Sequence, residues 1–281
     1  MKVLIQGLPE KEIAYIKNNC RKETEKGELT LLIVQKEASD VSLRGIDIVI
    51  SQEEAVLKKA VEEGIATIAY CKPEETMCSV PVDIVAEGFE EVDYRFLHRI
   101  LQRRNGEPWM ILETERLLVR EITLADMDAL FELYSYEGMT DYMEGLYPYE
   151  EEYAYQKAYI ENMYGFFGYG MWLVFEKESG KLVGRAGVEH REALDGELEL
   201  GYAIGTPWQG KGYATEVCLA ILSYAKEELG FERVVSLAEP GNRVSVHLLL
   251  KLGFTEGEEL LLDGIRYKKF EKSLETPIKC G

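Results

Sequence analysis

A glycine-containing segment, residues 208–216, lies between a predicted strand and a predicted helix. Ahead of it, Glu197 to Ile204 has the composition of a strand. Behind it, apolar residues recur every three or four positions from Tyr213 to Leu229, which predicts an amphipathic helix that ends at Gly230. The first turn of a helix has backbone N–H groups without intrahelical partners, and glycine has no Cβ. This order of elements therefore predicts a site for a phosphate or pyrophosphate.

The spacing of these glycines matches neither the P-loop nor the three-glycine dinucleotide fingerprint, and alone it could be a simple turn into a surface helix. However, Gln209, Gly212 and Ala214 resemble motif A of the GNAT acyltransferases, Gln/Arg-x-x-Gly-x-Gly/Ala. The resemblance implies that backbone amides here hold the pyrophosphate of acetyl-coenzyme A (acetyl-CoA). The residues expected to bind it are Gln209, Gly210, Lys211, Gly212, Tyr213, Ala214 and Thr215.

Other segments follow in the order of the same family. Leu112 to Ile122, with Asp126 and Leu130 after it, resembles the first strand of the subgroup that includes ribosomal-protein N-terminal alanine acetyltransferases. A predicted hairpin follows at residues 171–189. The resemblance extends to about Glu271 and implies a mixed-sheet α+β domain.

Two later segments are similar to the parts of this family that contact the coenzyme arm. The strand ending at Ile204 is similar to one that separates from its neighbour and pairs with pantetheine, which implicates Tyr202, Ala203 and Ile204. A helix opened by Asn242 and Ser245 is similar to the last helix of the family, which flanks the thiol. Both residue types also cap helices, so capping is the alternative role.

Acetyl transfer to an amine needs a base for the amine and a proton for the departing thiolate. The resemblance favours Glu199 as the base, directly or through water, with Glu189 and His190 in reserve. It favours Ser245 as the proton donor, because Leu249 stands where relatives often place a tyrosine. Glu199 could also be a charge on an exposed strand face.

An acidic, tyrosine-rich segment lies between the first two strands of this region. Ten of the 17 tyrosines in the chain fall between Tyr134 and Tyr169, together with seven acidic residues and one lysine. Aromatic faces and negative charge attract an ammonium group. The predicted acceptor is therefore a primary amine, either a peptide N-terminus or a small polyamine-like or amino-sugar molecule. The residues expected to bind it are Tyr142, Glu144, Tyr147 and Glu189; the alternative is an acidic solvated helix whose tyrosines pack on the sheet.

Residues 1–107 alternate predicted strands and helices, which indicates a Rossmann-like parallel sheet. The segment 46–101 vaguely resembles the trailing half of a haloacid-dehalogenase-like (HAD-like) domain. The carboxylates of that family are absent, because Gln6 ends the first strand and Ser51-Gln52 follows a later one. We expect a degenerate, non-catalytic domain that serves either the pairing of two identical chains in a homodimer or regulation.

Two local patterns set boundaries in this half of the chain. A capping-box pattern from Ser51 to Glu54 predicts the start of a helix over residues 52–63. Turn residues from Asn105 to Trp109 mark a boundary, with domains over residues 1–107 and 112–281. The predicted fold class is thus α/β, a Rossmann-like parallel-sheet domain followed by a mixed-sheet α+β GNAT domain.

Composition excludes several classes of function. A net charge of −19 argues against an electrostatic nucleic-acid binder, and no run of 18 apolar residues indicates a membrane span. No export signal is visible, and five scattered cysteines and three distant histidines predict a cytoplasmic protein without a metal site. A non-catalytic acyl-coenzyme A sensor stays open as the alternative to an enzyme.

Overall fold

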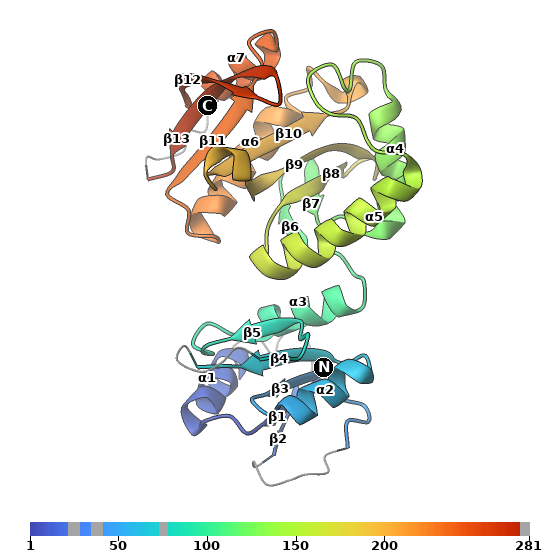
Figure 1. Cartoon of the computed structure of the whole chain (residues 1–281), viewed down its shortest axis with the longest axis vertical. Coiled ribbons are helices and arrows are strands. Elements are labelled where there is room, and N and C mark those ends of the chain that lie inside the picture. The colour runs from blue at the N-terminus through green and yellow to red at the C-terminus, as the bar shows by residue number, and fades with distance from the viewer. Residues whose placement is uncertain (22–28, 35–41, 73–77, 276–281) are drawn as a thin grey trace. The chain divides into compact units, whose positions relative to one another are not determined.

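The computed structural model describes residues 1–21, 29–34, 42–72 and 78–275. The chain divides into two compact units, Met1–Trp109 and Met110–Gly281 (Figure 1). Each unit has its own sheet. Among the helices within the described ranges, none combines the length and apolar composition needed to cross a bilayer.

The first unit contains a parallel sheet of five strands in the order β2-β1-β3-β4-β5. This is the flavodoxin-like order of doubly wound folds, and it confirms the predicted parallel sheet. In chain order the elements are β1 (Lys2–Gln6), α1 (Glu10–Arg21), β2 (Thr30–Val34), β3 (Ile48–Ser51), α2 (Glu54–Glu62), β4 (Ala66–Tyr70), β5 (Ile84–Ala86) and α3 (Tyr94–Arg104).

The central strands of this sheet are buried on both faces. Successive residues of a strand point to opposite sides, so Ile5 and Ile50 belong to one apolar cluster and Leu4 and Val49 to another. Such strands are continuous apolar runs in the sequence, which is why they could be predicted.

The predicted capping box in this unit is wrong. Ser51 is the last residue of β3, and α2 begins at Glu54 with Glu53 in the cap position and no side-chain cap. The Ser51 hydroxyl accepts the N–H of Glu53 at 3.0 Å. It therefore stabilises the turn between strand and helix and does not reach the N–H groups of the helix.

The second unit contains a mixed sheet, as predicted, and its eight strands lie in the order β12-β13-β11-β10-β9-β8-β7-β6. Among the strands described in this sheet, β10 and β11 are the only neighbours that run parallel to each other. The strands are β6 (Met110–Glu113), β7 (Leu117–Arg120), β8 (Met171–Glu176), β9 (Leu182–His190), β10 (Leu198–Ile204), β11 (Arg233–Ala238), β12 (Thr255–Leu262) and β13 (Ile265–Ser273). The longer helices are α4 (Met127–Ser135), α5 (Tyr149–Tyr159), α6 (Tyr213–Glu227) and α7 (Arg243–Lys251), and a π-helical segment, Ile160–Phe167, follows α5 directly.

The predicted first strand of this unit, residues 112–122, is in fact two antiparallel strands, β6 and β7. Thr114 N–H donates to the Leu117 carbonyl at 2.9 Å, and the Thr114 hydroxyl accepts from Leu117 N–H at 3.0 Å. The carboxylate of Glu216, from α6, accepts from the Thr114 hydroxyl and from the Arg116 amide. A turn therefore replaces a continuous strand.

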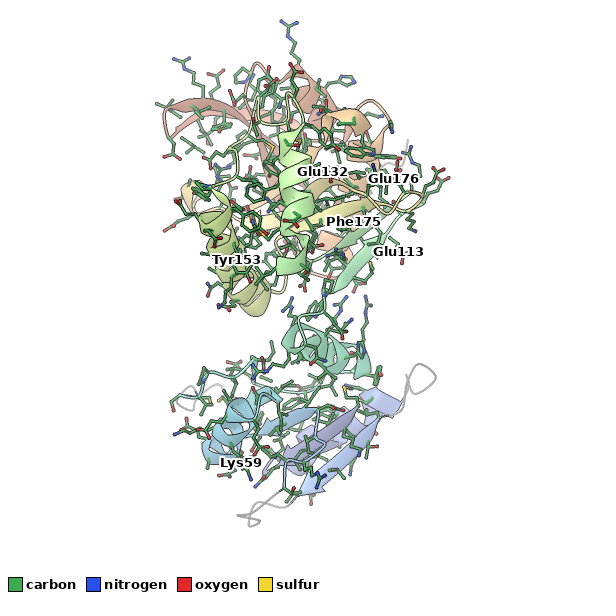
Figure 2. All side chains as sticks on the ribbon, turned by 90° about the vertical axis from the view of Figure 1, so that its right-hand side faces the viewer. Lys59, Glu113, Glu132, Tyr153, Phe175 and Glu176 are labelled. Atoms are coloured by element: carbon green, nitrogen blue, oxygen red, sulfur yellow. The ribbon has the colours of Figure 1, made fainter. Side chains whose placement is uncertain are left out.

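Helices cover both faces of this sheet. On one face Trp172 of β8 packs edge-on against Tyr224 of α6, with ring centroids 5.6 Å apart. On the other face Arg185 of β9 donates to the hydroxyl of Tyr134 on α4. Figure 2 shows α4, marked by Glu132, on that side. The two faces thus have different surroundings, and the second carries the charged groups.

Candidate functional site

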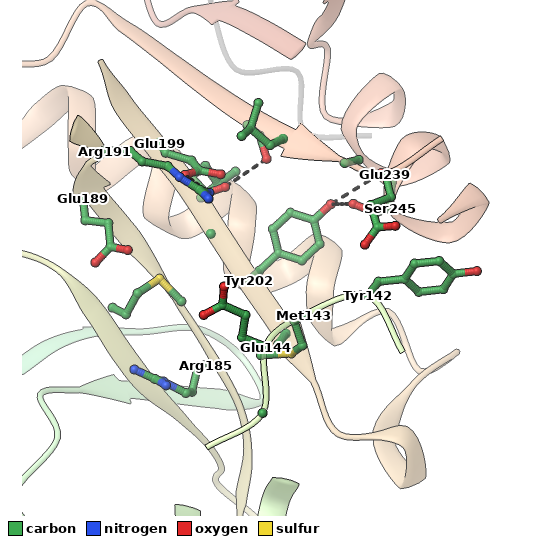
Figure 3. A pocket seen from close by; sticks show the side chains of 18 of the residues that line it. Tyr142, Met143, Glu144, Arg185, Glu189, Arg191, Glu199, Tyr202, Glu239 and Ser245 are labelled. Carbon is green, nitrogen blue, oxygen red and sulfur yellow. Dashed lines mark hydrogen bonds and ion pairs between the residues drawn. The ribbon is translucent and has the colours of Figure 1, made fainter. Parts of the chain in front are cut away.

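A cavity opens where β10 and β11 separate. β10 pairs with β9 along its whole length, but its only paired residue on the β11 side is Glu199, opposite Val235. The carbonyl of Leu200 accepts from the Ser236 hydroxyl at 2.9 Å, and that of Ile204 accepts from the Gln209 side chain at 2.9 Å. The cavity has a volume of about 420 Å³ and includes residues of β9, β10, β11 and α7 (Figure 3).

The three strand residues predicted at the coenzyme differ in position. Tyr202 and Ala203 line the cavity, whereas the Ile204 side chain is buried and its carbonyl is taken by Gln209. The side chain of Tyr202 extends toward α7, where its hydroxyl lies 2.7 Å from Ser245 Oγ. Burial raises the pKa of Tyr202, so the phenol stays protonated at neutral pH.

The predicted phosphate segment lies at the N-terminus of α6, outside the residues that line the cavity. Gly212 is the cap residue, with φ of +83° and no side-chain cap, and Gly210 has φ of +73°. Arg116 donates to the Lys211 carbonyl at 2.9 Å and pairs with Glu216 at 2.6 Å, which fixes the loop against α6.

The remaining predicted residues of this segment have varied surroundings. The Tyr213 hydroxyl donates to the carboxylate of Glu176, so this side chain packs on the sheet. Lys211 is exposed, and Ala214 and Thr215 are half-buried in the first turn of the helix. Helix geometry aligns the backbone N–H groups of Tyr213, Ala214 and Thr215, the first three residues of α6.

Asn242 and Ser245 both line the cavity at the start of α7. The Asn242 side-chain oxygen accepts the N–H of Ser245 at 3.1 Å, so Asn242 caps the helix. The Ser245 hydroxyl is not used for capping and contacts the Tyr202 phenol. A paired hydroxyl and phenol therefore lie at the end of the opening between the strands.

Glu199 faces the cavity from β10, and its carboxylate receives Arg191 Nη1 at 3.0 Å. Burial raises the pKa of Glu199, and the nearby Arg191 guanidinium opposes the rise without cancelling it. Glu189 is the cross-strand neighbour of Glu199 and adds to the rise. The pKa shift makes Glu199 a better proton acceptor than an ordinary surface glutamate.

The two reserve bases are placed differently. Glu189 lines the cavity, and its carboxylate accepts a hydrogen bond from the Tyr159 hydroxyl at 2.7 Å. His190 points elsewhere, because its Nδ1 lies 2.5 Å from the Gly196 carbonyl and its ring packs edge-on against Phe231. His190 is absent from the cavity lining.

All four residues predicted to bind the acceptor line the cavity, and Figure 3 labels three of them. The Tyr142 hydroxyl donates to the Gly241 carbonyl at 3.2 Å. The Tyr147 amide donates to Glu152 at 3.0 Å. The exposed carboxylate of Glu144 has no hydrogen-bond or ion-pair partner among the residues the structure describes.

Of the charged residues that line the cavity, only Glu144, Glu189 and Glu199 were predicted from the sequence as site residues. Five glutamates and two arginines line the space, a formal excess of three negative charges: Glu144, Glu152, Glu189, Glu199, Glu239, Arg185 and Arg191. Arg185 could have been found, because period-two alternation places it on the same face of its strand as Glu189. Tyr267 and Arg191 gave no such signal, since the first comes from the last hairpin and the second follows the end of a strand. No cluster suited to a metal ion occurs within the described ranges.

Sequence comparison matches residues 116–255 to the acetyltransferase (GNAT) domain family. The uncharacterized N-acetyltransferase YoaA of Bacillus subtilis is 30% identical over 146 residues, 51% of this chain and 82% of that protein. The [ribosomal protein uS5]-alanine N-acetyltransferase of Escherichia coli is 38% identical over 82 residues, 28% of this chain and 42% of that protein.

Solved structures give the same match in the second unit. A GNAT-family acetyltransferase from Bordetella pertussis aligns with a TM-score of 0.50 at 25% identity and covers 57% of this chain and 98% of its own. A GNAT-family acetyltransferase from Bacillus anthracis has a TM-score of 0.50 at 23% identity, covering 59% and 99%, and this likeness concerns the fold.

Proposed function

The chain belongs to the GNAT family of acetyltransferases, and from this premise we propose that it moves an acetyl group from acetyl-CoA directly to a primary amine. The separation of β10 from β11 beyond Glu199 is the observation that carries the proposal. Between the carbonyls of Leu200 and Ile204, which already accept side-chain hydrogen bonds, the main chain on that side can pair with an extended ligand as an added strand. The pantetheine arm of the coenzyme carries amides suited to this pairing.

The glycine segment ahead of α6 supports a seat for the pyrophosphate. A Cβ on Gly212 would meet Arg116 at 3.5 Å, and the φ of +83° disfavours any side chain there. Nothing lies within 4 Å of the Cβ position of Gly210. Phosphate oxygens can therefore approach the main chain, where free N–H groups and the helix dipole favour negative charge. When bound, the coenzyme supplies the acetyl thioester.

We assign the base to Glu199. Its carboxylate accepts the proton of the acceptor ammonium, directly or through water, and the neutral nitrogen then attacks the acetyl carbonyl carbon. The raised pKa of Glu199 suits this transfer, and Arg191 keeps the carboxylate oriented. Glu189 is bound by Tyr159 and is the second choice.

We assign the proton donor for the thiolate to Ser245. As the carbon–sulfur bond breaks, the Ser245 hydroxyl gives its proton to the departing sulfur. The Tyr202 phenol at 2.7 Å can replace that proton. The sequence suggested only the serine, because a tyrosine was sought at position 249 of the helix and not on the facing strand.

The acceptor side of the cavity supports an amine substrate. The carboxylates of Glu144 and Glu239 line the cavity without partners among the described residues, and Tyr142 and Tyr147 line the same cavity. Negative charge and aromatic faces attract an ammonium ion. The name of the E. coli relative favours a peptide N-terminus, and the size of the cavity also suits a small amine.

We propose that residues 1–107 form a separate domain without catalytic groups, followed by the acetyltransferase domain at 112–281. In the first domain the last residues of β1 and β3 are Gln6 and Ser51, so neither strand ends in a carboxylate residue. The proposed role is regulation or pairing of two chains. Light scattering of the full chain with and without acetyl-CoA tests this role, and a monomer of unchanged mass under both conditions would exclude pairing.

The enzymatic proposal is tested by following free thiol during incubation with acetyl-CoA and a panel of amines. Ser245→Ala should lower kcat by at least about tenfold with little change in coenzyme affinity, because the thiolate loses its proton donor. Ser223→Ala is the matched control, since that half-buried serine lies on α6, outside the cavity lining, and its hydroxyl donates to Glu227 of the same helix.

An unchanged rate in Ser245→Ala would remove this residue from the mechanism. Tight binding of acetyl-CoA without thiol release for any amine would instead favour the acyl-coenzyme A sensor.

A further inference from the structure

Arg185 is the one cavity arginine without a carboxylate partner in the described part of the chain. Its Nη1 donates to the Tyr134 hydroxyl at 3.2 Å, and its Nε is enclosed without a hydrogen-bond partner. By contrast, Arg191 pairs with Glu199 at 3.0 Å. A guanidinium is always charged, and enclosing it without a counter-charge costs free energy. A ligand that brings a negative charge to Arg185 would offset this cost.

The tyrosines around Arg185 do not provide the missing partner. The Tyr159 hydroxyl donates to Glu189 and accepts the N–H of Met171, each at 2.7 Å. The Tyr164 hydroxyl donates to the Met171 carbonyl and accepts the N–H of Ile122 at 3.4 Å. These oxygens are therefore occupied, and the planar fork of Arg185 has donors left for a ligand.

The β-sheet register places Arg185 on the acceptor side of the cavity. Arg185 lies opposite Ala203, and Glu189 lies opposite Glu199, so all four share one face. Four residues of strand separate the two positions by roughly 13 Å between Cα atoms. Gly201 lies between them on β10, where a Cβ would meet the sulfur of Met171 at 2.9 Å. Figure 3 labels Arg185 and Glu189, which both line the cavity.

We propose that Arg185 binds a carboxylate of the acceptor, so that the substrate is an amine that also carries a carboxylate, such as a free amino acid. This rests on the proposed function and narrows its acceptor. The amine lies toward Glu199 and Glu189, and the carboxylate receives the guanidinium fork. The two oxygens of a carboxylate match the parallel N–H donors of one guanidinium group. A doubly charged phosphate would be repelled more strongly by the five glutamates of the cavity.

The test compares each of the 20 L-amino acids with its carboxamide as acceptor. The full chain with acetyl-CoA should prefer the best carboxylate over its amide by about 10- to 100-fold in kcat/KM, the range expected for hydrogen bonds to a charged group. Arg185→Gln should lose this preference, because kcat/KM for the carboxylate falls further than kcat/KM for the amide, and Arg185→Lys should recover part of it. Arg266→Gln, at an exposed position on the last hairpin, is the matched control.

Binding is measured in parallel by calorimetry with coenzyme A present, so that the subsite is tested even without turnover. Carboxylate binding that Arg185→Gln abolishes, together with no thiol release for any amine, would support the subsite and sink the transfer proposal. Equal use and equal binding of carboxylates and amides by the unaltered chain would overturn the subsite and leave the transfer proposal standing. An equal loss for both acceptors in Arg185→Gln, with unchanged coenzyme affinity, would also overturn it.

Discussion

Glu199 has a raised pKa because it is buried on β10, and only its deprotonated form can accept a proton. Activity should therefore rise with pH through a midpoint above that of an ordinary glutamate. Glu199→Gln should lower kcat by about 10² to 10⁴-fold and remove this acidic limb. The pH profile of kcat/KM measures it. Glu189→Gln is the matched variant and should keep the limb; if it loses the limb instead, Glu189 is the base.

At the scale of single residues, sequence reasoning worked where the neighbours were local. The resemblance to the last helix of the family singled out Asn242 and Ser245, which lie in one helical turn, and both line the cavity. The partner of Ser245 was missed because Tyr202 comes from a strand 43 residues away. Arg185 was missed for a similar reason. Its proposed role depends on its having no carboxylate partner among the described residues, and the sequence does not show this.

At the N-terminus of α6, adding a single methyl group should affect both stability and coenzyme binding. Gly212→Ala adds a Cβ at a φ of +83°, which costs about 1–2 kcal/mol, and it places a methyl group where phosphate would approach. We expect lower stability and a KM for acetyl-CoA raised by about tenfold or more. Gly230→Ala, with a φ of +72° at the other end of the helix, has the same strain and open space around it.

Thermal unfolding and steady-state kinetics separate the two effects. Both variants should lose similar stability, and only Gly212→Ala should alter KM. A normal KM in that variant would contradict a phosphate seat at this helix end.

Elements with strong local patterns could be predicted, and those set by distant contacts could not. The closing hairpin turns at Asp263 and Gly264, both with positive φ, as an Asp-Gly pair predicts. The split between β6 and β7 depends on the carboxylate of Glu216, which is about a hundred positions further along the chain. No pattern within residues 112–122 carries that information.

On the scale of the whole molecule, each unit has a sheet and buried apolar residues of its own. Heating should therefore give two unfolding transitions. Acetyl-CoA should raise the midpoint temperature of only the transition that belongs to the second unit. A ligand at 100 times its Kd adds about 2.7 kcal/mol to the state that binds it. Differential scanning calorimetry with and without acetyl-CoA measures this. Equal shifts of both transitions would show that acetyl-CoA stabilises the first unit as well, either because it binds there or because the two units are strongly coupled.

The single paired position between β10 and β11 divides the large sheet into two groups of strands, β6 to β10 and β11 to β13. Glutamates of the acceptor wall come from both groups, since Glu199 lies on β10 and Glu239 follows β11. A coenzyme arm inserted between the groups would hold them at a fixed spacing and so complete the acceptor wall. This arrangement favours compulsory-order kinetics, with the acyl donor entering first and the amine second.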